Sequence, residues 1–354
     1  AQLNYTGLFA LTCLGLVLLT GVAGLTSFGQ AAFVGIGAYT AAWCALNLGW
    51  PPTVTLILGV TLTGVSAWVI GRITLRLSGH YLPLATIAWG LSLYYLMGNL
   101  EALGKYDGLI GLNSLTLFGH EIGQGRGFFV VSWSLLWVAT VALTFLLNSR
   151  PGRAIRSLKD GRQMAEAMGV DTFGYKVTIF VIAAVLASVA GWLMAYYQRA
   201  VNPSAFGLKW GIEYLFMVVV GGAGSLWGAW LGAGVVRVLD EQLQAWLPQL
   251  LGMSGSFESI VFGVMLVLIL KYRPDGLWSW VQQGLGKTER TRDWDDADVL
   301  AQRIKRACCR HWPRCSKRNL FIPTIDRTTP QQTLTRTCTR HFHFKSGWAL
   351  RRAH

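Results

Sequence analysis

Few residues of this chain have the type and spacing for chemistry. Residues 1–71 contain no Asp, Glu, Lys or Arg, and Glu213 stands near the start of a later apolar run, "GIEYLFMVV". A carboxylate among apolar residues is costly to bury, so it is a functional candidate. Two interpretations stay open. Glu213 lines or gates a path, or it lies near a membrane surface and pairs with Lys209, four residues earlier.

Sequence motifs for catalysis are missing from the apolar part of the chain. It contains no HExxH, GxSxG or CxxC pattern and no GxxxxGK[ST] phosphate loop. We therefore expect no catalytic residue, no cofactor and no ATP hydrolysis by the chain itself. Near the C-terminal end, Cys308, Cys309, His311 and Cys315 are a poor match to zinc-ligand spacings, so we predict no metal site.

One cationic segment stands out, "SRPGRAIRSLKDGRQMAEAMGVD" at 149–171. At helical spacing its apolar and polar residues fall on opposite halves of a wheel. The apolar half comprises Ala154, Ile155, Leu158, Met164, Ala165 and Met168, and the polar half Arg153, Arg156, Lys159, Asp160, Gln163 and Glu166. Such an element is too polar to span a membrane, but it can lie on the membrane face or dock into a soluble partner. An ordinary cationic loop would explain the arginines but not the amphipathic order.

The elements around this segment are strongly apolar. The chain is 53% hydrophobic and 14% charged, against about 25% charged for a soluble domain. Apolar runs cover approximately 7–25, 29–49, 53–71, 81–100, 128–147, 177–197, 211–222, 226–247 and 257–270. The sequence thus predicts an all-α, polytopic membrane protein with about 8–9 spans, some of them re-entrant or broken.

Charge orients these spans. Arg72 and Arg76, the cluster at 150–162, and Lys271 with Arg273 belong in the cytoplasm by the positive-inside rule. One consistent path starts outside and places 72–80, 148–176, 221–225 and 271 onward inside. The same path places 101–127, 198–210 and 240–244 outside.

Composition divides the chain into two parts. Residues 1–284 have 15 Lys and Arg against 11 Asp and Glu, and residues 285–354 have 16 against 6. We expect a transmembrane domain at 1–284, with a cytoplasmic loop at 148–176, and a basic, disordered cytoplasmic tail at 285–354. The tail's positive charge is compatible with attraction to anionic lipid at the membrane surface. It gives no reason to expect nucleic-acid binding. The first residue is Ala rather than Met, which is compatible with a fragment or a processed product.

Glycines and isolated polar residues mark the remaining candidates. "GGAGSLWGAWLGAG" at 221–234 contains Gly221, Gly222, Gly224, Gly228 and Gly232, which we expect to allow close helix packing. "GLTSFGQAAFVGIGAYTAA" at 24–42 reads either as a packed helix or as a broken helix lining a path. With Glu213, we take Gln30 and Thr86 as candidates for a translocation path, each alternatively a hydrogen-bond partner between helices.

Several stretches resemble one family in order along the chain. "AEAMG" at 165–169 resembles the core of the EAA loop of ABC importer permeases, and its frame is similar to branched-chain amino acid permeases of the LivM type, in the LivH/LivM family. "GVAGLTSFGQAAFVGIGAYTAA", "LRLSGHYLPLAT", "IEYLFMVVVGGAGSLWGAWLGA" and "KYRPDGLW" match as well, from about residue 8 to 280. Ala229 stands where the family usually has Pro, and Gln30 where His is common.

The resemblance implies a transport function with partners. It implies a permease in the cytoplasmic (inner) membrane that moves branched-chain amino acids. Its partners would be a second, homologous permease, two cytoplasmic ABC ATPases, an extracytoplasmic solute-binding protein and membrane lipid. In that family the cytoplasmic loop inserts into a cleft of the ATPase. Carried over by motif, the coupling residues are Arg153, Arg156, Asp160, Glu166, Ala167 and Gly169.

Alternatives remain within and outside this class. A urea or short-chain amide ABC permease shares these motifs. A secondary transporter or channel would need no ATPase, but carriers usually show inverted repeats and intramembrane charges for coupling ions. A membrane enzyme would show a cluster of titratable residues.

Overall fold

A computed structural model describes residues 2–77, 81–117, 120–123, 125–160, 166–251, 263–264, 271 and 276–285. The chain divides into two units, Ala1–Gly286 and Lys287–His354. All described residues belong to the first unit. The predicted tail and the Cys308–Cys315 cluster lie outside the described residues except at Leu285, so the boundary at 284/285 stays a prediction.

Helices make up most of the described chain. The helices are α1 (Gln2–Leu16), a π-helical turn η1 (Val17–Val22), α2 (Gln30–Asn47), α3 (Pro52–Thr74), α4 (Tyr81–Asn99), α5 (Arg126–Asn148), α6 (Arg150–Asp160), α8 (Thr172–Gln198), α9 (Leu208–Gly221), α10 (Leu226–Leu251) and α12 (Gly276–Leu285). Short 3-10 turns are η2 (Glu101–Leu103), η3 (Lys105–Asp107) and η4 (Pro203–Phe206), and the strands are β1 (Leu109–Ile110), β2 (Leu115–Leu117), β3 (His120–Ile122) and β4 (Ala200–Val201).

Long apolar helices confirm the predicted fold class. Within the described residues, Gln2–Val22, Pro52–Thr74, Arg126–Asn148 and Thr172–Gln198 are each long and apolar enough to cross a membrane. Helix α9 and residues Leu226–Leu243 of α10 together are also long and apolar enough, but they meet at a bend of 116°. They add a fifth span only if the bent pair is counted as one span. Most of the predicted run at 257–270 lies outside the described residues, so the count of eight to nine spans stays a prediction.

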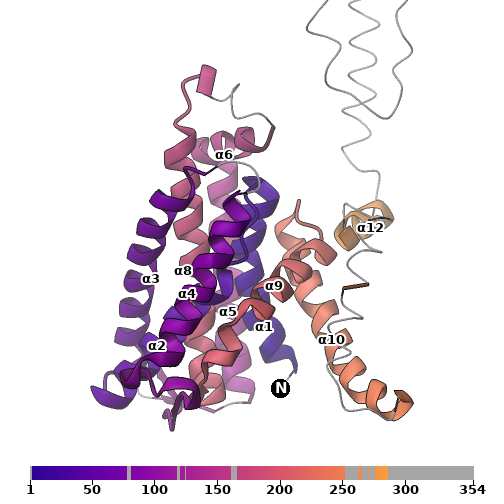
Figure 1. Cartoon of the computed structure of the whole chain (residues 1–354). Helices are drawn as coiled ribbons and strands as arrows, with labels where there is room; N and C mark the ends of the chain where they lie inside the picture. The colour runs from indigo at the N-terminus through magenta and orange to yellow at the C-terminus, as the bar shows by residue number, and fades with distance from the viewer. Residues whose placement is uncertain are drawn as a thin grey trace, which may run out of the picture. The chain divides into compact units, whose positions relative to one another are not determined.

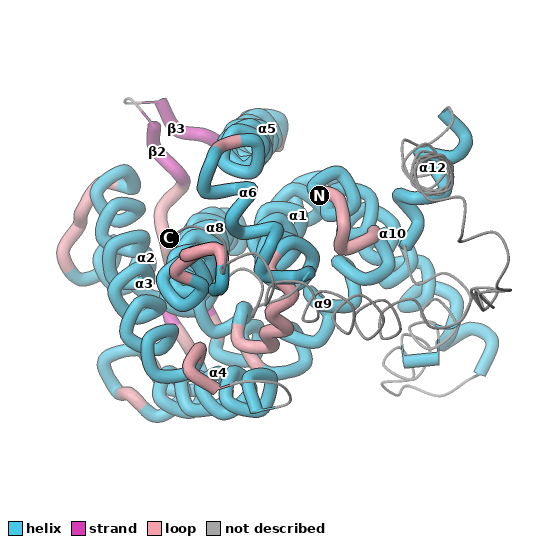
Figure 2. Tube along the Cα trace, turned by 90° about the horizontal axis from the view of Figure 1, so that it is seen from above, coloured by secondary structure: helices cyan, strands magenta, loops and turns pink. Residues whose placement is uncertain are grey.

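Two helices form the centre of the bundle. In their most apolar windows α1 is 78% buried and α8 67%, whereas α3 and α5 are each 33% buried. Viewed along the bundle, α8 and α1 lie between α2 and α3 on one side and α10 on the other (Figure 2). The outer helices expose apolar faces, such as Ile57 and Val65 on α3, which suits contact with lipid.

Small residues let α2 approach α8 closely. A Cβ added at Gly37 would overlap the Ser188 carbonyl, and one at Gly191 would overlap the Val34 carbonyl. Because lipid provides no hydrophobic drive for helix association, such close van der Waals contact is what holds membrane helices together. The α2–α8 pair is accordingly the most extensive helix contact in the described chain.

The two ends of the bundle differ. At one end β1 pairs antiparallel with β4, and β2 with β3. This end therefore contains parts of both 101–127 and 198–210, the two loops predicted to share the outer side. The cationic helix α6 lies at the opposite end, away from the start of α1 (Figure 1).

Candidate functional site

The cationic helix α6 has the predicted amphipathic order over its described length. Ile155 and Leu158 are buried against the bundle, whereas Arg153 and Arg156 are exposed. Its start is set by Ser149, whose hydroxyl accepts a bond from the Gly152 backbone N–H at 3.4 Å, as N-cap residues do. The helix thus packs through one face and leaves its arginines free of the bundle.

Lys159 connects α6 to the end of the first membrane helix. Its ammonium donates a hydrogen bond of 3.0 Å to the Gly21 carbonyl, in the π-helical turn η1. A cation at a helix C-terminus is favourable, because the last carbonyls carry partial negative charge and have no partner within the helix. The sequence placed Lys159 on the polar face of its helix, but it gave no sign of a partner 138 positions away.

The described residues near the end of the cationic segment, 166–169, are exposed. Glu166, Ala167 and Gly169 are all solvent-accessible, and the Glu166 carboxylate accepts a bond of 2.7 Å from the Thr172 hydroxyl. Gly169 has φ +78°, a conformation that favours glycine, with no atom near the position of a Cβ. Residues 161–165 lie outside the described part, and the side chain of Asp160 is not described.

The chain between η1 and α2 is broken at membrane depth. Residues 23–29 are not helical, and α2 begins at Gln30. The Gln30 amide donates a 2.6 Å bond to the carbonyl of Ala183, the twelfth residue of α8. At 1.5 Å per residue, Ala183 lies about 16 Å from the start of that helix. The break therefore dips toward the middle of the bundle. Residues 24–29 are irregular, whereas 30–42 belong to α2, which packs closely on α8; that this stretch lines a path stays a prediction.

Thr86 of α4 supports this break. Its hydroxyl accepts a bond of 3.2 Å from the Phe28 backbone N–H and donates one of 2.8 Å to the Pro83 carbonyl. A backbone N–H in lipid must find such a partner, because no water is there to replace it. Thr86 thus contacts the break directly, as a support for its backbone.

Some polar atoms at the break have no partner among the described residues. The Ser27 hydroxyl and the side-chain oxygen of Gln30 are buried, Gln30 being fully inaccessible, and neither has a hydrogen bond. The space beside Gly29 and Thr86 has a volume of about 10 Å³, room for about one water. This space is too small for a solute as large as an amino acid.

Glu213 lies on the helix that borders the break. It is 9% exposed on α9, two residues after Gly211, where an added Cβ would overlap the Phe28 carbonyl. Gln30 and Thr86 contact the break through hydrogen bonds. Glu213 lies on a helix that contacts the break through Gly211, and this helix, rather than a described contact of its own side chain, places it near the other two candidates.

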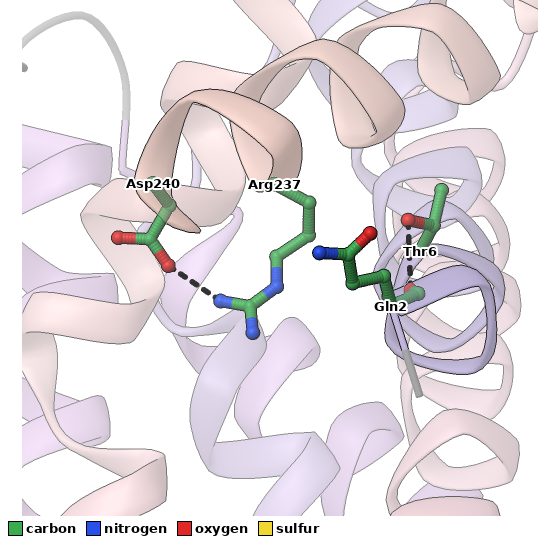
Figure 3. Close-up of polar contacts among 4 residues, drawn as sticks. All are labelled: Gln2, Thr6, Arg237 and Asp240. Atoms are coloured by element: carbon green, nitrogen blue, oxygen red, sulfur yellow. Dashed lines mark hydrogen bonds and ion pairs between the residues drawn. The ribbon is translucent and has the colours of Figure 1, made fainter. Parts of the chain in front are cut away.

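A buried ion pair was missed by the sequence reasoning. Arg237 and Asp240 of α10 form a bond of 2.6 Å, with the Asp240 side chain only 4% exposed. The Arg237 guanidinium also lies 5.2 Å from the ring centroids of Tyr5 and Phe9 on α1. Figure 3 shows Arg237 between Asp240 and the side of α1 that carries Gln2 and Thr6. The i,i+3 spacing of opposite charges in an apolar run was the available signal.

The glycines of 221–232 join α9 to α10. A Cβ at Gly221 or Gly228 would overlap backbone of the facing helix, and one at Gly232 would overlap the Met217 carbonyl. Gly222 has φ +107° in the turn between the helices. Gly224 is different, because nothing lies near the position of its Cβ.

Together these features define a class of protein. Broken helices within a membrane bundle occur in many transport proteins, and a bundle of this kind is compatible with a transport permease. The chain belongs to the family described as branched-chain amino acid transport system / permease component, whose profile matches residues 1–270.

Individual relatives cover most of the chain. A high-affinity branched-chain amino acid transport system permease protein, LivM of Salmonella typhimurium, is 28% identical over 77% of this chain and 68% of its own length. LivH of Escherichia coli, with the same description, is 25% identical over 76% of this chain and 90% of its own length. A probable branched-chain amino acid transport permease protein, LivM of Methanocaldococcus jannaschii, is 27% identical over 78% of this chain and 91% of its own length. No solved structure matches the chain.

Proposed function

We propose that the chain is a permease subunit of an ABC importer that moves branched-chain amino acids across the cytoplasmic membrane. The family match over residues 1–270 and the names of the relatives support the transport class and the substrate. The observation that carries the proposal is the exposed cationic segment on one end of the bundle, joined to a break in the membrane helices by Lys159 and Gly21.

The partners in this proposal are those that the relatives' transport systems imply. ATPase subunits would supply the energy for transport. Arg153, Arg156 and the stretch of Glu166, Ala167 and Gly169 form the surface on which an ATPase would dock. A second, homologous permease would complete the path, and an extracytoplasmic binding protein would deliver the amino acid at the end that carries β1 and β4.

Transport in this proposal couples the two ends of the bundle. Movement of α6 on the ATPase reaches η1 through the Lys159–Gly21 bond, and η1 continues directly into the break at 23–29. Opening the break would expose the Ser27 and Gln30 oxygens, which are hydrogen-bond acceptors suited to the ammonium group of an amino acid. Gln30, Thr86 and Glu213 are the path candidates in this account.

Glu166→Lys tests the docking surface. Reversing the charge replaces an acceptor of charge-assisted hydrogen bonds with a repelling cation, so we expect uptake of labelled leucine to be lost while the protein still inserts into the membrane. The matched control is Glu166→Asp, which keeps the carboxylate that accepts the hydrogen bond from the Thr172 hydroxyl, so uptake should be largely preserved. Normal uptake by the Glu166→Lys variant would contradict the coupling assignment.

A further inference from the structure

A groove between α3 and α8 is not used by the proposed transport mechanism. It lies where α3 ends and α8 begins, at the end of the bundle near α6, and has a volume of about 410 Å³. Small-molecule sites typically have about 300–1,000 Å³. The groove is therefore large enough for a headgroup and part of an acyl chain.

Opposite charges line one end of this groove without pairing. The Arg72 guanidinium lies 4.4 Å from the ring centroid of Trp68, one turn earlier on α3. Asp171 caps α8, one of its oxygens accepting the Gly174 N–H at 3.0 Å. No ion pair involves Arg72 or Asp171 within the described residues. Each charge is therefore available to a ligand.

The rest of the groove is apolar and descends along the membrane helices. Val181 and Ile182 line it from α8, nine and ten residues after Thr172 and so about 14 Å along the helix. Trp68, 47% exposed, is the type of residue that occupies the interface between headgroups and acyl chains. A second aromatic contact, Arg76 at 5.8 Å from the ring of Phe173, joins the two helix ends beside the groove.

We propose that this groove binds one phospholipid whose headgroup carries both a phosphate and a primary amine. The phosphate contacts Arg72, the ammonium contacts the free oxygen of Asp171, and an acyl chain lies along Val181 and Ile182. An anionic headgroup without the amine would face the uncompensated carboxylate of Asp171. A trimethylated amine cannot donate the hydrogen bond that this carboxylate accepts. Free phosphate has no acyl chain to cover the apolar wall of the groove, so this wall favours a lipid as the ligand.

The test is a count of retained lipid on the full chain. The protein is purified from nanodiscs containing equal parts of phosphatidylethanolamine, phosphatidylglycerol and phosphatidylcholine, with any subunits that co-purify, and native mass spectrometry identifies the lipid that survives mild delipidation. We expect one phosphatidylethanolamine per chain. Arg72→Gln should lower its retention by about fivefold or more, because the charge-assisted hydrogen bonds from the guanidinium to the phosphate are lost.

Asp171→Asn separates binding from folding. Asn caps a helix as well as Asp does, so α8 keeps its start while the charge is lost, and phosphatidylethanolamine should lose its preference over phosphatidylcholine. The controls are Arg126→Gln and Asp107→Asn, the same changes at the other end of the bundle, which should retain the lipid. Equal retention by the variants and the unmodified protein, preference for phosphatidylglycerol, or no retained lipid would each overturn the proposal.

Discussion

Lys159 is the residue on which the proposed coupling depends most directly. Lys159→Met keeps much of the side-chain length but removes the ammonium that binds the Gly21 carbonyl. We expect leucine uptake to fall about tenfold, while the partner subunits continue to hydrolyse ATP, because docking and the membrane break would no longer be connected. Both rates can be measured on the same reconstituted complex.

Lys159→Arg is the matched control for this prediction. An arginine keeps the positive charge and its donors, so uptake should be largely preserved. Unchanged uptake in Lys159→Met would contradict a role for this bond in transport. Loss of both ATP hydrolysis and subunit assembly would instead indicate that Lys159 acts in docking.

Asp240 and Arg237 give a prediction about stability. Removing one member of a buried ion pair leaves the other charge uncompensated, which costs about 3–5 kcal/mol. Asp240→Ala should therefore lower the thermal unfolding midpoint in detergent substantially. The double variant Arg237→Met with Asp240→Leu removes both charges and should recover much of the loss. If the single variant unfolds like the unmodified protein, the pair contributes nothing to stability.

At the scale of residues, the sequence identified types of side chain better than their contacts. Gln30 and Thr86 stood out as polar residues in apolar runs, and both contact the break. Their partners, the Ala183 carbonyl and the Phe28 N–H, lie 153 and 58 positions away, and no local pattern encodes such distances. Arg237 was overlooked because its helix was read as one apolar run.

At the scale of elements, an added methyl group at Gly228 or at Gly224 should have different effects on stability. Gly228→Ala places a methyl group against the Gly221 and Gly222 carbonyls, backbone atoms that cannot rotate away. Overpacking of this kind costs about 1–3 kcal/mol, so we expect a lower unfolding midpoint. Gly224→Ala, four residues earlier and open to space, should change it little. Equal midpoints for the two variants would contradict the close contact of α9 with α10.

The periodicity of the sequence predicted the elements well and their breaks less well. The amphipathic order of 149–160 matches the buried and exposed faces of α6, because alternation at helical spacing is local information. The break at 23–29 was one of two interpretations, since glycines and small polar residues occur both in packed helices and in irregular segments. The place of the break depends on the acceptor on α4 and on the crossing of α2 with α8, and both are tertiary contacts that no local pattern encodes.

At the scale of the whole molecule, the tail gives the clearest prediction. Residues 285–354 carry a net charge of +10 without amphipathic order, and the family profile ends at residue 270. Deleting residues 290–354 should leave membrane insertion, subunit assembly and leucine uptake intact. Loss of any of these would assign the tail a function that its composition does not indicate.

The central claim is that this chain works as a subunit coupled to ATPases, and co-purification tests it most directly. The chain is extracted from its native membranes with a mild detergent, and everything that accompanies it is identified by mass spectrometry. The account predicts a second permease and ATPases with a phosphate loop, together with a binding protein whose bound ligand is a branched-chain amino acid. Reproducible recovery of the folded chain alone would contradict it and would favour a self-sufficient carrier or channel.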